Sequence, residues 1–197
     1  MILVFIKPIN SLEPKNHQTI KPSNHQNKFG STVFNNKSFN SLNIYGSLTF
    51  KNINIKEKLN VFGSLTGHNL KCFDLKVKGR TNIKDTKVYG TLNISGTIYC
   101  EKILVVGKTT VSGAINSSNS TFNDIEISGM KIKFNNSTIK NIFINKNSNN
   151  KDEVQKIYLK NTTVENDISF ESGIGEIFIE GKSKIIGNIK GGKINKI

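Results

Sequence analysis

Glycine recurs in this chain at an almost fixed interval, and this period constrains the fold more than any other feature of the sequence. The series, with successive intervals of 17, 16, 17, 17 and 16 residues, is Gly46, Gly63, Gly79, Gly96, Gly113 and Gly129. Most of these glycines close a five-residue phrase whose first and third residues are apolar, as in LNIYG, LNVFG and LNISG. A short fixed period predicts a solenoid, in which each repeat stacks on the next.

The residues between the glycines predict strands. Ile, Val, Thr, Phe and Tyr alternate with polar residues, a period of two that is typical of half-buried strands. Each repeat divides into three short strands, and the inward residues of the first repeat are Leu42, Ile44, Leu48, Phe50, Ile53 and Ile55. Three apolar pairs per repeat predict an all-β chain folded as a triangular parallel β-helix, with 16–17 residues in each of about eight or nine turns.

We expect one domain preceded by an arm. Residues 1–41 contain all three prolines, are rich in Asn, Lys, Ser and His, and show no hydrophobic period, which predicts a flexible basic arm. The solenoid domain then covers residues 42–197, and the polar run NKNSNNKDE predicts a protruding loop at 145–153. No apolar run approaches the roughly 18 residues that a membrane-spanning helix needs.

Residues that could support catalysis or metal binding are few and scattered. Cys72 and Cys100 occupy inward positions two repeats apart, about 10 Å along the axis, so we expect two buried free thiols. His68 is the only histidine inside the expected fold, and Arg80 is the only arginine. The repeat is shorter than the turn of hexapeptide acyltransferases, and the aspartates are not clustered as in metal-assisted pectate lyases. We therefore predict a chain that is not an enzyme, with no catalytic residue, cofactor or metal.

Positive charge is concentrated in the first half of the chain. The net charge is +14, and residues 1–100 carry 14 Lys and Arg against four Asp and Glu. Outward positions predict a basic collar that consists of Lys51, Lys71, Lys76, Lys78, Arg80, Lys84 and Lys87. It is either a solvated face or a surface for an anionic membrane or envelope polysaccharide; we do not expect nucleic acid. Tyr45 and Phe62, outward in successive repeats, predict a stacked aromatic ladder.

Several phrases of the repeat resemble bactofilins: LNVFGSL, LKVKGRT, LNISGTI and the Gly-Asn-Ile step at 187–189. The resemblance covers residues 42–144 well and residues 157–197 less closely. It implies a right-handed β-helix that polymerises end to end into nonpolar cytoskeletal filaments without nucleotide, often at the membrane. The chain is also similar to repetitive β-solenoid proteins of unknown role in intracellular bacteria, some of which carry export signals.

The two ends of the expected solenoid favour self-association, because end turns present unpaired backbone groups. The predicted end-to-end interface joins the first apolar layer to the last and consists of Leu42, Ile44, Leu48, Ile185, Ile189, Ile194 and Ile197. The expected function is that of a self-assembling scaffold in the bacterial cytoplasm or at its membrane. The alternative is a monomeric adhesion or effector module that uses its basic face and is exported to the cell envelope through a longer signal peptide.

Overall fold

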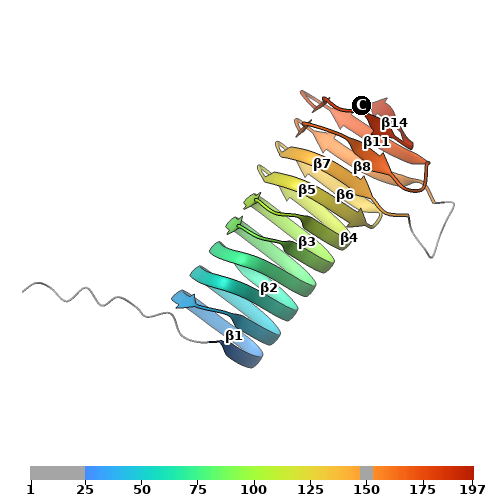
Figure 1. Cartoon of the computed structure of the whole chain (residues 1–197). Helices are drawn as coiled ribbons and strands as arrows, with labels where there is room; N and C mark the ends of the chain where they lie inside the picture. Colours follow the sequence, from blue (N-terminus) through green and yellow to red (C-terminus); the bar gives the residue numbers. More distant parts are fainter. Residues whose placement is uncertain (1–24, 147–152) are drawn as a thin grey trace, which may run out of the picture.

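The computed structural model describes residues 25–146 and 153–197, which form one parallel β-solenoid of about 10 turns (Figure 1). The predicted all-β solenoid is therefore confirmed, with slightly more turns than the eight or nine expected. Residues 1–24 of the predicted arm and residues 147–152 of the predicted loop lie outside the described residues.

The described chain consists of strands and short corners, and the strands form one 14-stranded sheet that coils around the core. Their bounds are β1 Gln26–Phe39, β2 Leu42–Val88, β3 Leu92–Val105, β4 Thr109–Ser118, β5 Thr121–Ser128, β6 Lys131–Asn135, β7 Thr138–Ile144, β8 Gln155–Lys160, β9 Thr163–Val164, β10 Ile168–Phe170, β11 Gly175–Glu180, β12 Lys184–Ile185, β13 Ile189–Lys190 and β14 Gly192–Lys196.

Every strand pairs in parallel with the segment one turn away, so equivalent positions of the repeat lie opposite each other. Gly46 pairs with Gly30, and Gly96 pairs with both Gly79 and Gly113. The later turns are longer: Ile142 pairs with Ile168, 26 residues on (168 − 142). These longer turns explain why the period of the sequence weakens after residue 144.

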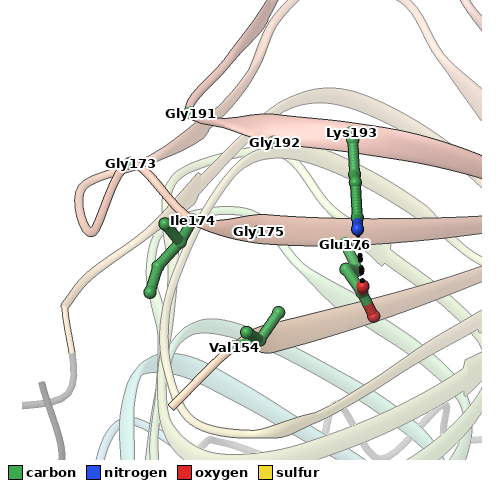
Figure 2. A pocket seen from close by; sticks show the side chains of 8 residues that line it. All are labelled: Val154, Gly173, Ile174, Gly175, Glu176, Gly191, Gly192 and Lys193. Atoms are coloured by element: carbon green, nitrogen blue, oxygen red, sulfur yellow. Dashed lines mark ion pairs between the residues drawn. The ribbon is translucent and has the colours of Figure 1, made fainter. Parts of the chain in front are cut away.

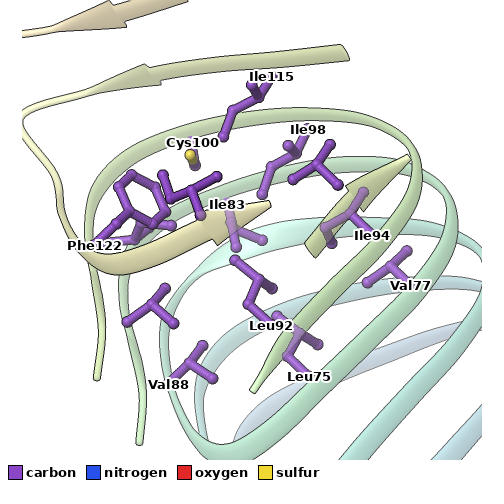
Figure 3. Close-up of a cluster of buried hydrophobic side chains, with 14 of the residues drawn as sticks. Leu75, Val77, Ile83, Val88, Leu92, Ile94, Ile98, Cys100, Ile115 and Phe122 are labelled. Carbon is purple, nitrogen blue, oxygen red and sulfur yellow. The ribbon is translucent and has the colours of Figure 1, made fainter. Parts of the chain in front are cut away.

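Inward side chains form one continuous apolar core along the axis. In β2 the buried residues alternate with exposed ones in three pairs per turn, which gives the three sides of the predicted triangle. Val77, Ile94 and Ile115, which come from successive strands, all belong to this core (Figure 3). The inward and outward assignments predicted for residues 42–144 are therefore confirmed, and burial of this apolar surface is the main stabilising contribution.

The recurring glycine lies at the corner between the first and second sides. From Gly46 to Gly113 the φ angle is between +135° and +145°, a region that is strained for any other residue. A Cβ atom at Gly96 would also lie 2.2 Å from the carbonyl oxygen of Gly79, one turn earlier. Glycine is thus required both by the local backbone conformation and by the close approach of the neighbouring turn.

The corner between the second and third sides uses asparagine instead, which the sequence reasoning did not detect. Eight non-glycine residues with φ between 46° and 60° mark it: Asn36, Asn52, Asn69, Asp85, Lys102, Asn119, Asn136 and Asn161. Asparagine tolerates this left-handed conformation better than other side chains. The Asn52 amide donates to Asn36 at 2.8 Å, and the Asn69 amide donates to Asn52 at 2.9 Å. Much of the asparagine in the sequence therefore has a structural role.

In the C-terminal turns, the residue after this corner carries a hydroxyl group, and these hydroxyls form a column of hydrogen bonds between turns. The hydroxyl oxygen of Ser120 accepts a hydrogen bond from the Ile103 amide at 3.2 Å, and that of Ser137 accepts one from the Ser120 amide at 3.2 Å. Thr162 and Ser183 repeat the arrangement in the next two turns. Each hydroxyl also donates to a backbone carbonyl, as Ser120 does to Ser118 at 2.7 Å. We call these four residues the hydroxyl column.

The solenoid begins at Gln26, sixteen residues before the predicted start at Leu42 (42 − 26). Strand β1 pairs with β2 along a complete turn, so the prediction of a flexible arm is wrong for residues 26–41. The error has a simple cause. Several inward positions of β1 carry polar residues, Gln26, Lys28, Thr32 and Lys37, so this turn has no hydrophobic period.

Candidate functional site

In the N-terminal turn of the solenoid, most inward positions carry polar residues. Lys28 occupies the position that Ile44 takes one turn later, and Lys37 occupies the position of Ile53. Only Phe34 and Phe39 continue the apolar core there, with ring centroids 4.8 Å apart. Charged residues in inward positions of an edge strand oppose the addition of a further strand. This end is therefore poorly suited to stack on another molecule.

Strand β1 also removes half of the predicted end-to-end interface. Leu42, Ile44 and Leu48 are completely buried because β1 pairs with the strand that carries them. They belong to the interior of the solenoid and form no end layer. The prediction that these three residues contact a second molecule is corrected accordingly.

The C-terminal end, in contrast, presents an apolar layer. Ile185 and Ile189 are partly buried and pack on the core, and Ile194 lies opposite Ile177 with 44% of its surface exposed. Ile197, the fourth predicted residue, directly follows β14 and has the opposite phase to the inward Ile194, because side chains alternate along an extended chain. The structure thus places Ile185, Ile189 and Ile194 at inward positions of the last turn and Ile197 on the outer surface.

The residues of the basic collar are all exposed, but they are distributed over the three sides of the solenoid. On the first side, Lys76 and Lys78 precede the Gly79 corner, which Arg80 follows. Lys51 and Lys84 end the second side, whereas Lys71 and Lys87 lie on the third. Among the described residues, only Lys84 of these seven makes an ion pair, with Glu101 at 3.0 Å. A flat partner could contact only part of the collar at once.

The predicted aromatic ladder is present on the first side and includes one more residue. The rings of Tyr45 and Phe62 are 5.1 Å apart and almost parallel, and Phe29 of β1 stacks on Tyr45 at the same distance. The ammonium group of Lys78 lies 5.6 Å from the centre of the Phe62 ring. Most ring faces are therefore occupied by one another, which indicates a structural ladder.

A second exposed apolar group, which the sequence reasoning missed, lies at the corner between the third and first sides. Phe73, Tyr89 and Val106 occupy this corner in three successive turns, each directly after the last inward residue of its turn. Their exposed fractions are 53%, 49% and 50%. An apolar residue in an outward position was the feature of the sequence that could have revealed this group. We call Phe73, Tyr89 and Val106 the corner ridge.

Two surface depressions in the C-terminal half have their polar groups satisfied within the chain. One is lined by Gly173, Gly175, Gly191 and Gly192, together with Glu176 and Lys193 (Figure 2). The Lys193 ammonium contacts Glu176 at 3.2 Å and lowers the pKa of this carboxyl, and Lys156 contacts it at 3.5 Å. A carboxylate held by two cations is poorly suited to act as a base.

The other depression contains Asp124, Glu126, Asn141, Phe143 and Asp167. The Asn141 amide donates to Asp124 at 2.7 Å, and its oxygen accepts from the Asp167 backbone amide at 3.3 Å. Hydrogen bonding to Lys108 lowers the pKa of Glu126. These contacts connect neighbouring turns, so the polar groups have a structural role.

The two cysteines are free and buried, as predicted. Burial raises the pKa of each thiol to about 12, so neither is a thiolate nucleophile at neutral pH. Cys100 is surrounded by apolar side chains such as Ile98 and Phe122 (Figure 3). His68 is exposed. Within residues 25–146 and 153–197 no group of three or more His, Cys, Asp or Glu side chains could hold a metal ion.

Comparisons with known protein families, with curated proteins and with solved structures found no match to this chain. In the part of the chain that the structure describes, no helix is long and apolar enough to cross a membrane. The chain is a β-solenoid protein, and this fold is consistent with a structural or binding role.

Proposed function

We propose that this protein is a non-enzymatic scaffold that associates through the C-terminal end of its solenoid. The observation that carries the proposal is the difference between the two ends. Polar and charged residues, including Lys28 and Lys37, fill inward positions of the N-terminal turn. At the other end, isoleucines fill three inward positions of the last turn: Ile185, Ile189 and Ile194.

The apolar layer supplies the driving force for association. Burying one isoleucine side chain contributes roughly 1.5–3 kcal/mol, so three of them offset a substantial part of the cost of bringing two molecules together. The edge strands β13 and β14 also pair on one side only, with β10 and β11 respectively, so their backbone groups on the other side have no strand partner among the described residues. A second copy of the same end is the partner that matches both features.

The polarity of the ends favours a tail-to-tail pair over an open filament. Head-to-tail stacking would bury Lys28 and Lys37 in the contact between two molecules, which is costly for unpaired charges. A symmetric pair places apolar layer on apolar layer and is the commonest geometry of homo-oligomers. The proposal therefore retains the self-association implied by the bactofilin resemblance but limits it to one end.

Lysines near the C-terminal end oppose association less than their number suggests. Lys190 pairs with Asp167 at 3.7 Å, and Lys193 pairs with Glu176 at 3.2 Å. Lys196 lies opposite Ile179, in an inward position at the margin of the layer. Of the three, Lys196 is the one that would weaken a tail-to-tail contact.

Light scattering of the full-length protein over a range of concentrations tests this proposal. Wild-type protein should run as a dimer at high concentration, Ile194→Lys should run as a monomer, and Lys196→Ile should strengthen the dimer. Val33→Lys is the matched control, because Val33 is an exposed apolar residue at the opposite end, 65% exposed. A wild-type monomer at all concentrations, or equal disruption by Val33→Lys, would contradict the proposal.

The second candidate is a monomeric binding module that uses the basic collar. Six of its seven basic residues make no ion pair among the described residues, so their charges are available to an anionic partner. A non-enzymatic role is supported for either candidate by the buried thiols and by the ion-paired carboxylates of the two depressions. A wild-type protein that stays monomeric would favour this second function.

A further inference from the structure

The corner ridge is a row of three exposed apolar side chains in successive turns of the solenoid. The Gly90 amide donates to the Phe73 carbonyl at 2.7 Å, and the Gly107 amide donates to the Gly90 carbonyl at 3.1 Å. The three ridge residues therefore lie in adjacent turns, about 5 Å apart along the axis. About half of each side chain is exposed. An exposed apolar group of this kind, with polar surroundings, marks an interaction surface.

Lysines flank the ridge on both sides. Lys71 and Lys87, both in β2, lie two residues before Phe73 and Tyr89, respectively, and have the outward phase of the third side. Lys76 lies on the first side, just after the corner. These three lysines are exposed and make no ion pair among the described residues. In the preceding turn, the position equivalent to Phe73 is occupied by Lys56.

The acidic residues near the ridge are engaged by neighbouring groups. Asp74 accepts hydrogen bonds from the Thr91 amide at 2.8 Å and from the Thr91 hydroxyl at 2.9 Å. Glu57 accepts a hydrogen bond from the Ser41 hydroxyl at 2.8 Å. Their charges reduce the local positive potential but do not separate the lysines from the ridge.

We propose that the corner ridge is a membrane-docking edge, with Phe73, Tyr89 and Val106 in the interfacial layer of an anionic bilayer and the flanking lysines on its headgroups. Aromatic side chains are favoured at the level of the headgroups, where one part of the ring is apolar and another part is polar. Lysines close to an anionic surface add attraction that weakens with salt. A projecting corner allows lysines from two sides to reach the same flat surface.

The combination of groups identifies a bilayer as the partner. A soluble polyanion would be attracted by Lys71, Lys76 and Lys87 but would gain little from apolar side chains at the tip of the corner. One weak apolar contact and one patch of charge together hold a protein on a membrane where either alone does not. The collar residues on the second side, Lys51 and Lys84, lie away from the ridge and are not part of this contact.

A single tryptophan provides a direct measurement, because the chain has none of its own. In Phe73→Trp, addition of vesicles that contain phosphatidylserine should shift the emission to the blue and allow quenching by brominated lipid. Tyr99→Trp is the control, because Tyr99 is 47% exposed on the second side of the solenoid. Equal shifts in both variants, or none in either, would overturn the proposal.

Vesicle co-sedimentation of the full-length protein separates the apolar and the charged contributions. Phe73→Ser with Tyr89→Ser should weaken binding at least tenfold, whereas Tyr99→Ser should leave it unchanged. Lys71→Gln with Lys87→Gln should weaken it about thirtyfold at low salt. The control is Lys51→Gln with Lys182→Gln, which removes two exposed lysines from other turns and should change binding much less. If the two lysine substitutions weaken vesicle binding but the two serine substitutions do not, the surface binds a soluble polyanion, and the proposal is overturned. Circular dichroism of each variant checks that the solenoid remains folded.

Discussion

The N-terminal and C-terminal halves of the solenoid have the same cross-section but fill one inward position differently. This position follows the asparagine corner. Lys37 occupies this position in β1, and the next four turns carry Ile53, Leu70, Thr86 and Ile103 there. The later turns carry Ser120, Ser137, Thr162 and Ser183. A solenoid can therefore replace apolar contacts by hydrogen bonds, provided that each buried hydroxyl finds partners in its own and the neighbouring turn.

The surfaces of the two halves differ in charge pairing. Five ion pairs connect turns in the second half, the first of them between Lys108 and Glu126. The described part of the first half has only Lys84–Glu101 and the contact between His25 and Glu57. The first half consequently presents unpaired positive charge to a partner, whereas the second half uses its charges within the chain and presents an apolar end.

The largest expected effect is common to both halves. Ile94→Asp in the first half and Ile127→Asp in the second each place an unpaired charge in the core, where both wild-type residues are fully buried. We expect a loss of more than about 4 kcal/mol and disappearance of the β-type circular dichroism signal. Asn93→Asp, in an outward position, should be nearly silent. Equal loss for Asn93→Asp would show that the register is wrong, since a one-residue slip exchanges the faces.

The next largest effect distinguishes the interior turns from the first turn. Gly96→Ala should destabilise the protein by about 3 kcal/mol or more, because the new Cβ would lie 2.2 Å from a backbone oxygen and φ is +135°. At Gly30 φ is +78° but no atom lies within 4 Å of the added Cβ. Gly30→Ala should therefore cost only about 1 kcal/mol. Denaturant unfolding measures the loss of stability in both variants. Similar losses would show that the close approach between turns is not the cause of the loss in Gly96→Ala.

The hydroxyl column predicts a smaller effect, confined to the second half. Ser137→Ala leaves the buried Ser120 amide without its partner and should cost about 1–3 kcal/mol. Hydrogen exchange at the Ser120 amide should become faster in the variant. Ser95→Ala, at an exposed outward position, should change stability by less than about 0.5 kcal/mol. An unchanged unfolding midpoint in Ser137→Ala would show that the column does not stabilise the C-terminal turns.

The smallest expected effect is a gain in stability. The Thr109 hydroxyl is buried and has no hydrogen-bond partner among the described residues, whereas the Thr162 hydroxyl donates to the Lys160 carbonyl at 2.9 Å. Thr109→Val should therefore stabilise the protein by about 1 kcal/mol, and Thr162→Val should destabilise it by a similar or larger amount. Thermal unfolding compares the two. The same sign for both substitutions would contradict the assignment of hydroxyl partners.

The sequence by itself determined the class of fold and the orientation of most side chains between residues 42 and 144. Strict alternation allows only one set of residues to face a buried core, so Leu59, Ile94 and Ile125 could be assigned as inward without a structure. The glycine period fixed one corner, since few other residues tolerate its conformation. The aromatic ladder at Tyr45 and Phe62 followed from the same period.

Only the tertiary structure decided where the solenoid begins and what lies on its surface. Strand β1 carries Lys28 and Lys37 in inward positions, and it is held by backbone pairing with β2, which leaves no trace in hydrophobicity. The corner ridge and the contrast between the two ends likewise depend on which residues lie side by side in neighbouring turns. Such neighbours are 16–26 residues apart in the chain. Alternation along one strand gives the face of a residue, but contacts between turns depend on the stacking of the whole solenoid.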